Sequence, residues 1–177
     1  MKRVRSHIAW GTLAALAVLG ILSCTEQAPK EMSLKEAFEG KFHIGTALNV
    51  PQILGRDSAA IKVVKEHFGA IVAENCMKSG PMQPTEGYFE FELADQFVEF
   101  GMENNMHITG HTLIWHSQAP RWFFTDEEGN DVSPEVLKER MRTHIHTVVK
   151  RYKGKIHGWD VVNEAILDDG SYRPSKF

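Results

Sequence analysis

The sequence has 177 residues and a formal net charge of −3, with a pI near 6.3. Such a weakly acidic chain gives no indication of the basic surface that nucleic acid requires, so we expect no nucleic-acid partner. Apolar residues make up 42% of the chain, which is enough for one packed domain, but the chain is shorter than the roughly 250 residues of a full α/β barrel.

The N-terminal segment has the features of an export signal. Three basic residues, Lys2, Arg3 and Arg5, precede an apolar run over residues 8–22. That run is too short to span a membrane comfortably, because a spanning helix needs about 20 apolar residues. A charged start followed by a short apolar run is typical of a signal peptide.

The end of the apolar run, Ile-Leu-Ser-Cys at residues 21–24, resembles the processing site of a bacterial lipoprotein. The resemblance implies a signal peptide over residues 1–23, lipidation of Cys24, and a lipid anchor in the cell envelope, in the periplasm or at the outer membrane and cell surface. A polar tether over residues 24–33 would join the anchor to a domain over residues 34–177. An ordinary secretory signal and an uncleaved anchor are the alternatives.

Apolar runs and helical spacings alternate along the rest of the chain. Buried strands are predicted at residues 44–48, 70–73, 107–115 and 157–165. Helices are predicted at residues 34–38, 57–68 and 92–104, and from Ser133 and Pro134 to a stop at Gly154. The fourth strand contains Trp-Asp-Val-Val-Asn-Glu, and its apolar continuity is typical of a strand that is covered on both faces.

A helical crossover separates each predicted strand from the next, so the predicted class is α/β with a parallel sheet. The carboxyl ends of parallel strands meet at one rim, where α/β folds place their chemistry. Eight polar or aromatic residues at three strand ends are expected there: Glu74, Asn75, Lys78, His111, Trp115, His116, Asn163 and Glu164. Together these groups suit a polyhydroxylated neutral ligand, whose hydroxyls they would hydrogen-bond while an indole face packs on a sugar ring.

Each of these residues also has an ordinary structural interpretation. Glu74 with Asn75, or Glu164 alone, is typical of a helix N-terminus. Lys78 is equally typical of a solvated loop, and Trp115 of a core. Residue types alone leave both interpretations open.

Three separated blocks resemble signature motifs of the glycoside hydrolase family 10 endo-β-1,4-xylanases. The blocks are Glu-Asn-Cys-Met-Lys (74–78), Gly-His-Thr-Leu-Ile-Trp-His-Ser-Gln (110–118) and Trp-Asp-Val-Val-Asn-Glu (159–164). Residues 152–156 and 84–91 match supporting parts of the pattern, so the resemblance covers roughly residues 42–177. It implies a (β/α)8 TIM barrel, of which this chain carries the first four or so β/α units.

The resemblance implies a retaining hydrolysis that needs no cofactor. Glu164 is implied as the general acid/base, which protonates the leaving oxygen and later deprotonates water. Asn163 is implied to contact the hydroxyl next to the reacting carbon, and His116 to hold a neighbouring carboxylate in place.

The other rim residues are implied to bind substrate. Glu74, Asn75 and Lys78 would hold sugars on the non-reducing side of the cleaved bond. His111 and Trp115 would line the subsite where cleavage happens. The family usually has an acidic residue where this chain has Cys76, a position not implied to contact sugar.

The nucleophilic carboxylate that retention requires is not among these motifs. In the family it follows the seventh barrel strand, whereas the elements predicted here end with the fourth. Asp168 and Asp169 follow Glu164 too closely, in a loop with Gly170, to replace it. The expected explanations are an incomplete gene product or a barrel interrupted by an inserted binding module.

The missing C-terminal half of the barrel is therefore an expected partner. Without it, the first and fourth strands would be unpaired edges with apolar faces exposed, and we expect aggregation, self-association or weak folding of the isolated chain.

Two kinds of function follow from these interpretations. The first is a lipid-anchored endo-β-1,4-xylanase that acts on xylan or xylo-oligosaccharides and is inactive as this chain alone. The second is a non-catalytic, lipid-anchored xylan- or oligosaccharide-binding protein. A metal-dependent hydrolase is disfavoured, and no metal is expected, because His144 and His146 would face different directions on a helix and no His-Glu-x-x-His motif occurs. The motifs do not distinguish xylan from mixed-linkage glucan.

Overall fold

The computed structural model describes residues 31–177. The predicted signal peptide, Cys24 and most of the predicted tether lie outside the described residues. Within the described range, no helix is long and apolar enough to cross a membrane.

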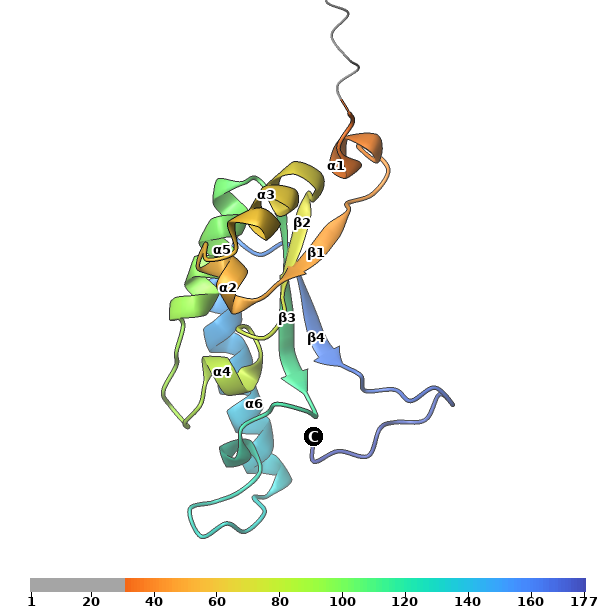
Figure 1. Ribbon diagram of the computed structural model, residues 1–177. Coiled ribbons are helices and arrows are strands. Elements are labelled where there is room, and N and C mark those ends of the chain that lie inside the picture. The colour runs from red at the N-terminus through yellow and green to blue at the C-terminus, as the bar shows by residue number, and fades with distance from the viewer. Residues whose placement is uncertain (1–30) are drawn as a thin grey trace, which may run out of the picture. The chain divides into compact units, whose positions relative to one another are not determined.

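A parallel sheet organises the described residues (Figure 1). Its four strands occur in the order β1-β2-β3-β4, and they are β1 (Gly45–Leu48), β2 (Ala70–Ala73), β3 (His107–Trp115) and β4 (Gly158–Asn163). Every neighbouring pair is parallel, as the alternation of strand and helix predicted. All four carboxyl ends therefore lie at one rim.

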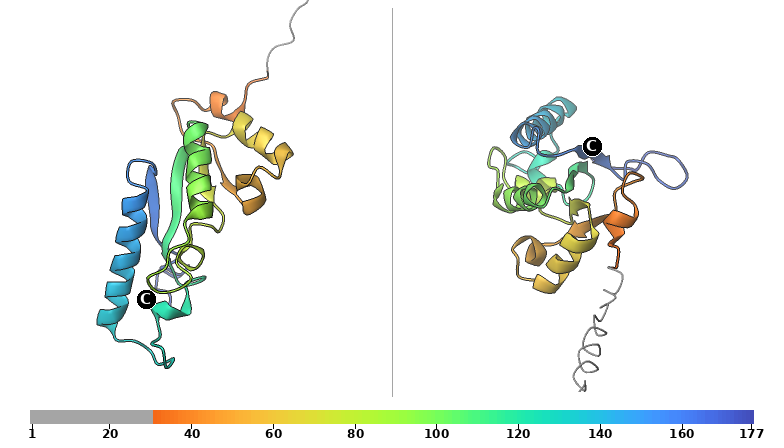
Figure 2. Two further views of the ribbon diagram at one scale, coloured as in Figure 1. Left: turned by 90° about the vertical axis from the view of Figure 1, so that its left-hand side faces the viewer. Right: turned by 90° about the horizontal axis from the view of Figure 1, so that it is seen from above.

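Helices precede and connect the strands. They are α1 (Leu34–Ala37), α2 (Val50–Ile53), α3 (Ser58–His67), α4 (Ser79–Met82), α5 (Glu92–Glu103) and α6 (Pro134–Arg151), together with the 3-10 helix η1 (Arg121–Phe123). Helices α3, α5 and α6 run along one face of the sheet (Figures 1 and 2). The opposite face carries no helix among residues 31–177, so the arrangement is that of successive β/α units of a barrel with the interior face open.

The hydrophobic core fills the space between the sheet and these helices. Ile71 and Ile108 come from the strands, while Phe97 and Val148 come from the helices, and all four are buried. Helix α5 approaches the sheet closely because Gly101 has no side chain: a Cβ atom there would lie 2.6 Å from Ile108 Cδ1.

Gly110 permits a second close approach. A Cβ atom at Gly110 would lie 2.3 Å from the six-membered ring of Trp159, so this position of β3 must be glycine for the Trp159 ring of β4 to pack against it. Two of the three sequence motifs thus meet across the β3–β4 pair.

The longer predicted elements are confirmed, with ends that differ by at most three residues. Helix α6 begins at Pro134, directly after Ser133, as predicted, and Ser133 Oγ caps it by accepting a hydrogen bond from the Val136 backbone N–H. Three short helices, α2, α4 and η1, were not predicted because three or four residues are too few to show a period of 3.6. Helix α2 nevertheless carries a local signal, a reciprocal capping box between Asn49 and Gln52.

The apolar run in β4 predicted cover on both faces of the strand, but within residues 31–177 neither face is fully covered at Val161 and Val162, whose side chains point to opposite faces. Within residues 31–177, β1 and β4 each pair with a single neighbour. Val161 and Val162 are consequently 51% and 52% exposed. An edge strand with exposed β-branched residues is a surface on which further strands pair readily.

His144 on α6 is a buried titratable group in this core. It is fully buried, its Nδ1 lies 2.9 Å from Gln83 Oε1, and Phe89 and Phe123 flank its ring. Since an amide oxygen only accepts, Nδ1 carries the proton in this contact. Burial lowers the pKa of His144 from 6.5 to about 4, because the charged imidazolium loses its hydration.

We expect His144 to make the chain less stable in acid. Between pH 6.5 and pH 4 the unfolded chain binds more protons at this position than the folded chain, so the free energy of unfolding falls as the pH falls through this range. The loss amounts to about 3 kcal/mol at most. Urea denaturation at several pH values should show a flatter pH dependence for His144→Gln, which keeps a side-chain N–H but does not titrate. An unchanged slope would contradict the assignment.

Candidate functional site

Lys78 is a buried ammonium group at the rim of the sheet. It follows β2, occupies the position directly before α4, and is 7% exposed. Its Nζ donates a hydrogen bond to Asn75 Oδ1 at 2.8 Å and lies 4.8 Å from the ring centroid of Trp115. In the described residues Lys78 forms no ion pair, so its remaining N–H donors are available to a ligand oxygen.

Trp115 joins this group to Glu164. The indole Nε1 of Trp115, at the end of β3, donates a hydrogen bond to Glu164 Oε2 at 3.0 Å. His116 Nε2 lies 3.8 Å from the same oxygen. Asn75, Lys78, Trp115, His116 and Glu164 therefore form one connected cluster built from the carboxyl ends of three consecutive strands.

The backbone of Glu164 is held in an unusual conformation. Its φ angle is 54°, in the left-handed region that residues other than glycine rarely adopt, and such conformations are concentrated at functional sites. Arg173 holds it there: Arg173 Nε donates to the carbonyl oxygen of Glu164 at 2.8 Å, and the Arg173 backbone N–H donates to the carbonyl oxygen of Ala165 at 2.8 Å.

His111 precedes Trp115 in β3, and its imidazole has a carboxylate partner. Its Nδ1 donates a hydrogen bond to Asp160 Oδ2 at 2.9 Å, and the two residues are register partners of β3 and β4. Thr112 Oγ1 donates to the carbonyl oxygen of Asp160 at 2.9 Å. Because a carboxylate only accepts, the pair leaves the His111 Nε2 free to accept a hydrogen bond while the imidazole is neutral.

The two remaining predicted site residues lie at the same rim by their place in the strands. Glu74 is exposed directly after β2, and Asn163 ends β4 as the register partner of Trp115. Cys76, where the family pattern is acidic, is buried in the hydrophobic core, and burial raises the pKa of its thiol to about 11. Its side chain is thus packed away from the rim as a neutral thiol.

Two hollows flank the cluster. One of about 430 Å³ lies on the open face of the sheet and is lined in part by Thr46, His111 and Asp160. Another of about 280 Å³ lies beneath the C-terminal segment and is lined in part by His116 and Glu164. The polar cluster is therefore accessible from solvent.

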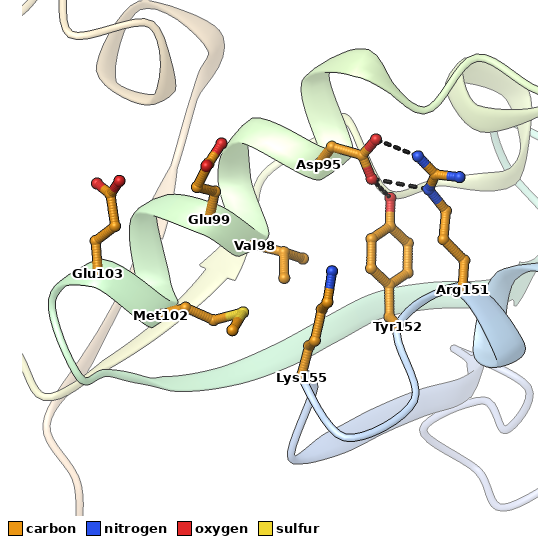
Figure 3. Close-up of a pocket in the computed structure, with 8 residues that line it drawn as sticks. All are labelled: Asp95, Val98, Glu99, Met102, Glu103, Arg151, Tyr152 and Lys155. Carbon is orange, nitrogen blue, oxygen red and sulfur yellow. Dashed lines mark hydrogen bonds and ion pairs between the residues drawn. The ribbon is translucent and has the colours of Figure 1, made fainter.

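A larger hollow than these two, about 620 Å³, lies elsewhere, between α5 and the end of α6 (Figure 3). The Asp95 carboxylate there accepts hydrogen bonds from the Arg151 guanidinium and from Tyr152 Oη. The Arg151 bonds hold the pKa of Asp95 below its usual value. These groups use their hydrogen bonds on one another and link α5 to the end of α6. None of the predicted site residues lines this hollow.

The fold and the cluster together define the class of protein. Parallel β/α units with carboxylates, amides, an ammonium group and an indole at the carboxyl ends of the strands are the rim of a β/α-barrel protein that suits a sugar ligand. Within residues 31–177, no group of three or more His, Cys, Asp or Glu side chains is arranged to hold a metal ion.

Comparison with known proteins identifies the family. The profile described as glycosyl hydrolase family 10 matches residues 33–177, and the chain belongs to that family. The endo-1,4-beta-xylanase A of Xylanibacter ruminicola is 48% identical over 159 residues, which cover 90% of this chain and 43% of that protein. The endo-1,4-beta-xylanase A of Halalkalibacterium halodurans is 44% identical, over 82% of this chain and 39% of its own length.

Solved structures of the family have the same fold. A GH10 endoxylanase from a sugarcane soil metagenome is 42% identical with a TM-score of 0.78, over 82% of this chain and 44% of its own. A mutant structure in complex with xylotriose is 35% identical with a TM-score of 0.76, over 82% of this chain and 44% of its own. The chain thus spans less than half of the length of these relatives, and its four strands are part of a TIM barrel.

The sequence motifs predicted most residues of the cluster. They did not predict Asp160 and Arg173, which hydrogen-bond to His111 and Glu164. Asp160 lies within the third motif, and its pairing with His111 depends on the register between β3 and β4, which no pattern in either strand reveals. Arg173 contacts Glu164 from nine residues further along the chain, through a loop without periodicity.

Asp160→Ala is expected to release the His111 ring. With the carboxylate removed, the Nδ1–H tautomer loses its partner and the Nε2–H tautomer should become populated. The measurement is 15N NMR of histidine-labelled protein in a barrel chimera, which we define as residues 33–177 of this chain joined to the second half of the Xylanibacter ruminicola xylanase. Asp168→Ala, in the exposed loop after β4, is the control. An unchanged His111 tautomer in Asp160→Ala would contradict the proposed pairing.

Proposed function

We propose that this chain forms the acid/base half of a retaining endo-β-1,4-xylanase, with Glu164 as the general acid/base. The observation that carries the proposal is the placement of Glu164 directly after β4, with one carboxylate oxygen 3.0 Å from Trp115 Nε1 and Lys78 on the face of the same indole. A group that exchanges protons with a glycosidic oxygen must stand beside the residues that hold the sugar. The names of the matched relatives support xylan as the substrate class.

Each side chain of the cluster has a part in this mechanism. Lys78 and Asn75 donate to hydroxyls of sugars on the non-reducing side, and Glu74 accepts from them at the outer edge of the rim. Trp115 holds the Glu164 carboxyl in place through its indole N–H. Glu164 protonates the oxygen of the leaving sugar, and it later takes a proton from the water that releases the product.

Other rim residues position the reacting sugar. Asn163 presents its amide at the strand end beside Glu164, where a hydroxyl next to the reacting carbon would lie. His111, oriented by Asp160, faces the open side of the sheet and contacts the same sugar. His116 holds a carboxylate, and in the described residues its nearest carboxylate partner is Glu164 itself.

The nucleophile must come from a second carboxylate about 5–5.5 Å from Glu164. Asp160 is occupied by His111, and Asp169 is hydrogen-bonded to Ser171 in an exposed loop. We therefore propose that the second carboxylate belongs to the other half of the barrel, which would pair with the exposed edges of β1 and β4. Binding of the polymer by this chain without turnover is the alternative function.

Export and anchoring form a separate part of the proposal. Lys2, Arg3 and Arg5, the apolar run and the Ile-Leu-Ser-Cys sequence support a lipoprotein signal, with the lipid on Cys24 and the domain in the cell envelope.

Glu164→Gln tests the acid/base role in the barrel chimera. Glutamine keeps the shape of the side chain and its contact with Trp115 but holds no transferable proton, so kcat on unactivated xylan should fall at least about 100-fold. Glu128→Gln, in an exposed loop, is the matched control and should leave the rate unchanged. Near-normal xylan hydrolysis by Glu164→Gln would exclude this role.

Calorimetry with xylo-oligosaccharides separates the alternative function. Saturable binding by the 177-residue chain, together with a chimera that binds but does not cleave xylan, would favour a non-catalytic binding protein. Hydrolysis by the chimera would exclude it.

Cys24→Ser tests the proposed anchor. In a bacterial host given labelled fatty acid, the original chain should incorporate the label and fractionate with membranes, because the thioether-linked lipid supplies the apolar anchor. Cys24→Ser should incorporate no label, whereas Cys76→Ser, the control, should be labelled normally. Label retained by Cys24→Ser would exclude Cys24 as the lipidated residue.

A further inference from the structure

The segment that carries Lys78 is fastened to two other parts of the chain. We call residues 78–91, the part of the connection between β2 and α5 that begins at Lys78, the Lys78 loop. Its start lies at the sugar-binding rim, and the Gly80 backbone N–H donates to the carbonyl oxygen of Gln118, beyond the end of β3, at 3.1 Å. A Cβ atom at Gly80 would lie 2.5 Å from that oxygen, so the two segments are in close contact.

Gln83 forms the second attachment of the Lys78 loop. It is 1% exposed, and its backbone carbonyl oxygen accepts a hydrogen bond from Trp122 Nε1 at 2.9 Å. Its side-chain oxygen contacts His144 Nδ1 on α6 at 2.9 Å. One residue of the loop is thus held both by η1 and by α6.

Arg140 on α6 forms the third attachment and is the most extensive. Its Nε and one terminal nitrogen donate to the two carboxylate oxygens of Glu86, at 2.8 and 2.6 Å. The other terminal nitrogen donates to the carbonyl oxygens of Trp122 and of Thr125, the latter at 3.0 Å. Although Glu86 is about half exposed, the Arg140 side chain is only 14% exposed.

Helix α4 links these attachments to Lys78. The Met82 backbone N–H donates to the carbonyl oxygen of Lys78 at 3.0 Å, and the Gln83 N–H donates to that of Ser79 at 2.8 Å. This single turn is short and buried, so a displacement of Gln83 moves the backbone of Lys78. The ammonium group then shifts relative to Asn75 and the Trp115 ring.

We propose that Arg140 is a positioning residue that holds the Lys78 loop against the segment after β3, and thereby sets how tightly the rim binds sugars on the non-reducing side of the cleaved bond. The inference rests on the proposed function for its substrate. Arg140 suits this role because its guanidinium fork serves a carboxylate of one loop and carbonyl oxygens of the other at the same time. A lysine, with one compact ammonium group, would not satisfy both.

The first test follows backbone motion and does not depend on activity. Arg140→Met in the full 177-residue chain should speed hydrogen exchange of the Gly80, Gln83 and Glu90 amides by about 10-fold or more, because these amides are bonded within or across the Lys78 loop. The amides of β2 and β3 should not change. Arg142→Met, on the same helix with an exposed side chain paired to Glu139, is the matched control.

The second test measures binding in the barrel chimera with two aryl glycosides. An aryl β-xyloside places one sugar on the non-reducing side of the cleaved bond, and an aryl β-xylobioside places two. Arg140→Met should raise KM for the xylobioside about 5- to 10-fold while kcat changes less than about 2-fold. The reason is that the substitution weakens binding of the substrate and of the transition state equally. The xyloside should be affected less, and Arg140→Lys should restore KM only in part.

These outcomes separate the two proposals. Equal losses on both substrates, or the same loss in Arg142→Met, would overturn the positioning role. If the unmodified chimera cleaves neither substrate, the proposed function fails. Calorimetry with xylotriose then decides the positioning role: weaker binding by Arg140→Met together with faster loop exchange supports it, and unchanged binding or unchanged exchange excludes it.

Discussion

The parallel direction of the four strands is the constraint on which the site depends. Each helical crossover returns the chain to the same end of the sheet, so residues 75, 115 and 164 leave their strands at one rim although some 90 positions separate the first from the last. A hydrogen bond from Trp115 to Glu164 then joins the third strand to the fourth. Reversing β2, β3 or β4 within the sheet would have placed one of the three groups at the other end of the molecule.

Within residues 31–177, Lys78 places a buried positive charge with free hydrogen-bond donors at the rim. Burying an ammonium group without an anion is unfavourable, and here an amide oxygen and an indole face provide only partial compensation. The donors that remain are fixed in place before a ligand arrives. The proposed neutral polyhydroxylated ligand would satisfy them with hydroxyl oxygens, and because the site is already ordered, little side-chain entropy would be lost on binding.

The sequence predicted the parts of the structure that follow from local patterns. Apolar runs located all four strands, helical spacing located α3, α5 and α6, and the parallel order then placed Lys78, Trp115 and Glu164 together. Asp160 and Arg140 were not predicted, because their partners His111 and Glu86 are 49 and 54 positions away and the contacts depend on register and helix rotation. The left-handed backbone of Glu164 was likewise not predicted, because glutamate has no preference for it and the contact with Arg173 comes from a later loop.

The described residues cover one face of the sheet with helices and leave the other face open. The helical face has a core in which Ile71, Phe97 and Ile108 are buried, and its close approaches at Gly101 and Gly110 leave no space for a side chain at either position. The other face lies open above Thr46 and His111, and β4 exposes Val161 and Val162 at its edge. Apolar packing against the helices holds the sheet on that side, whereas enclosing a sugar between two carboxylates, as proposed, would require cover over the open face. Under the proposed function, substrate positioning by this chain and attack by the nucleophile fall on different parts of the barrel, and the residues that hold the Lys78 loop belong to the part that positions the substrate.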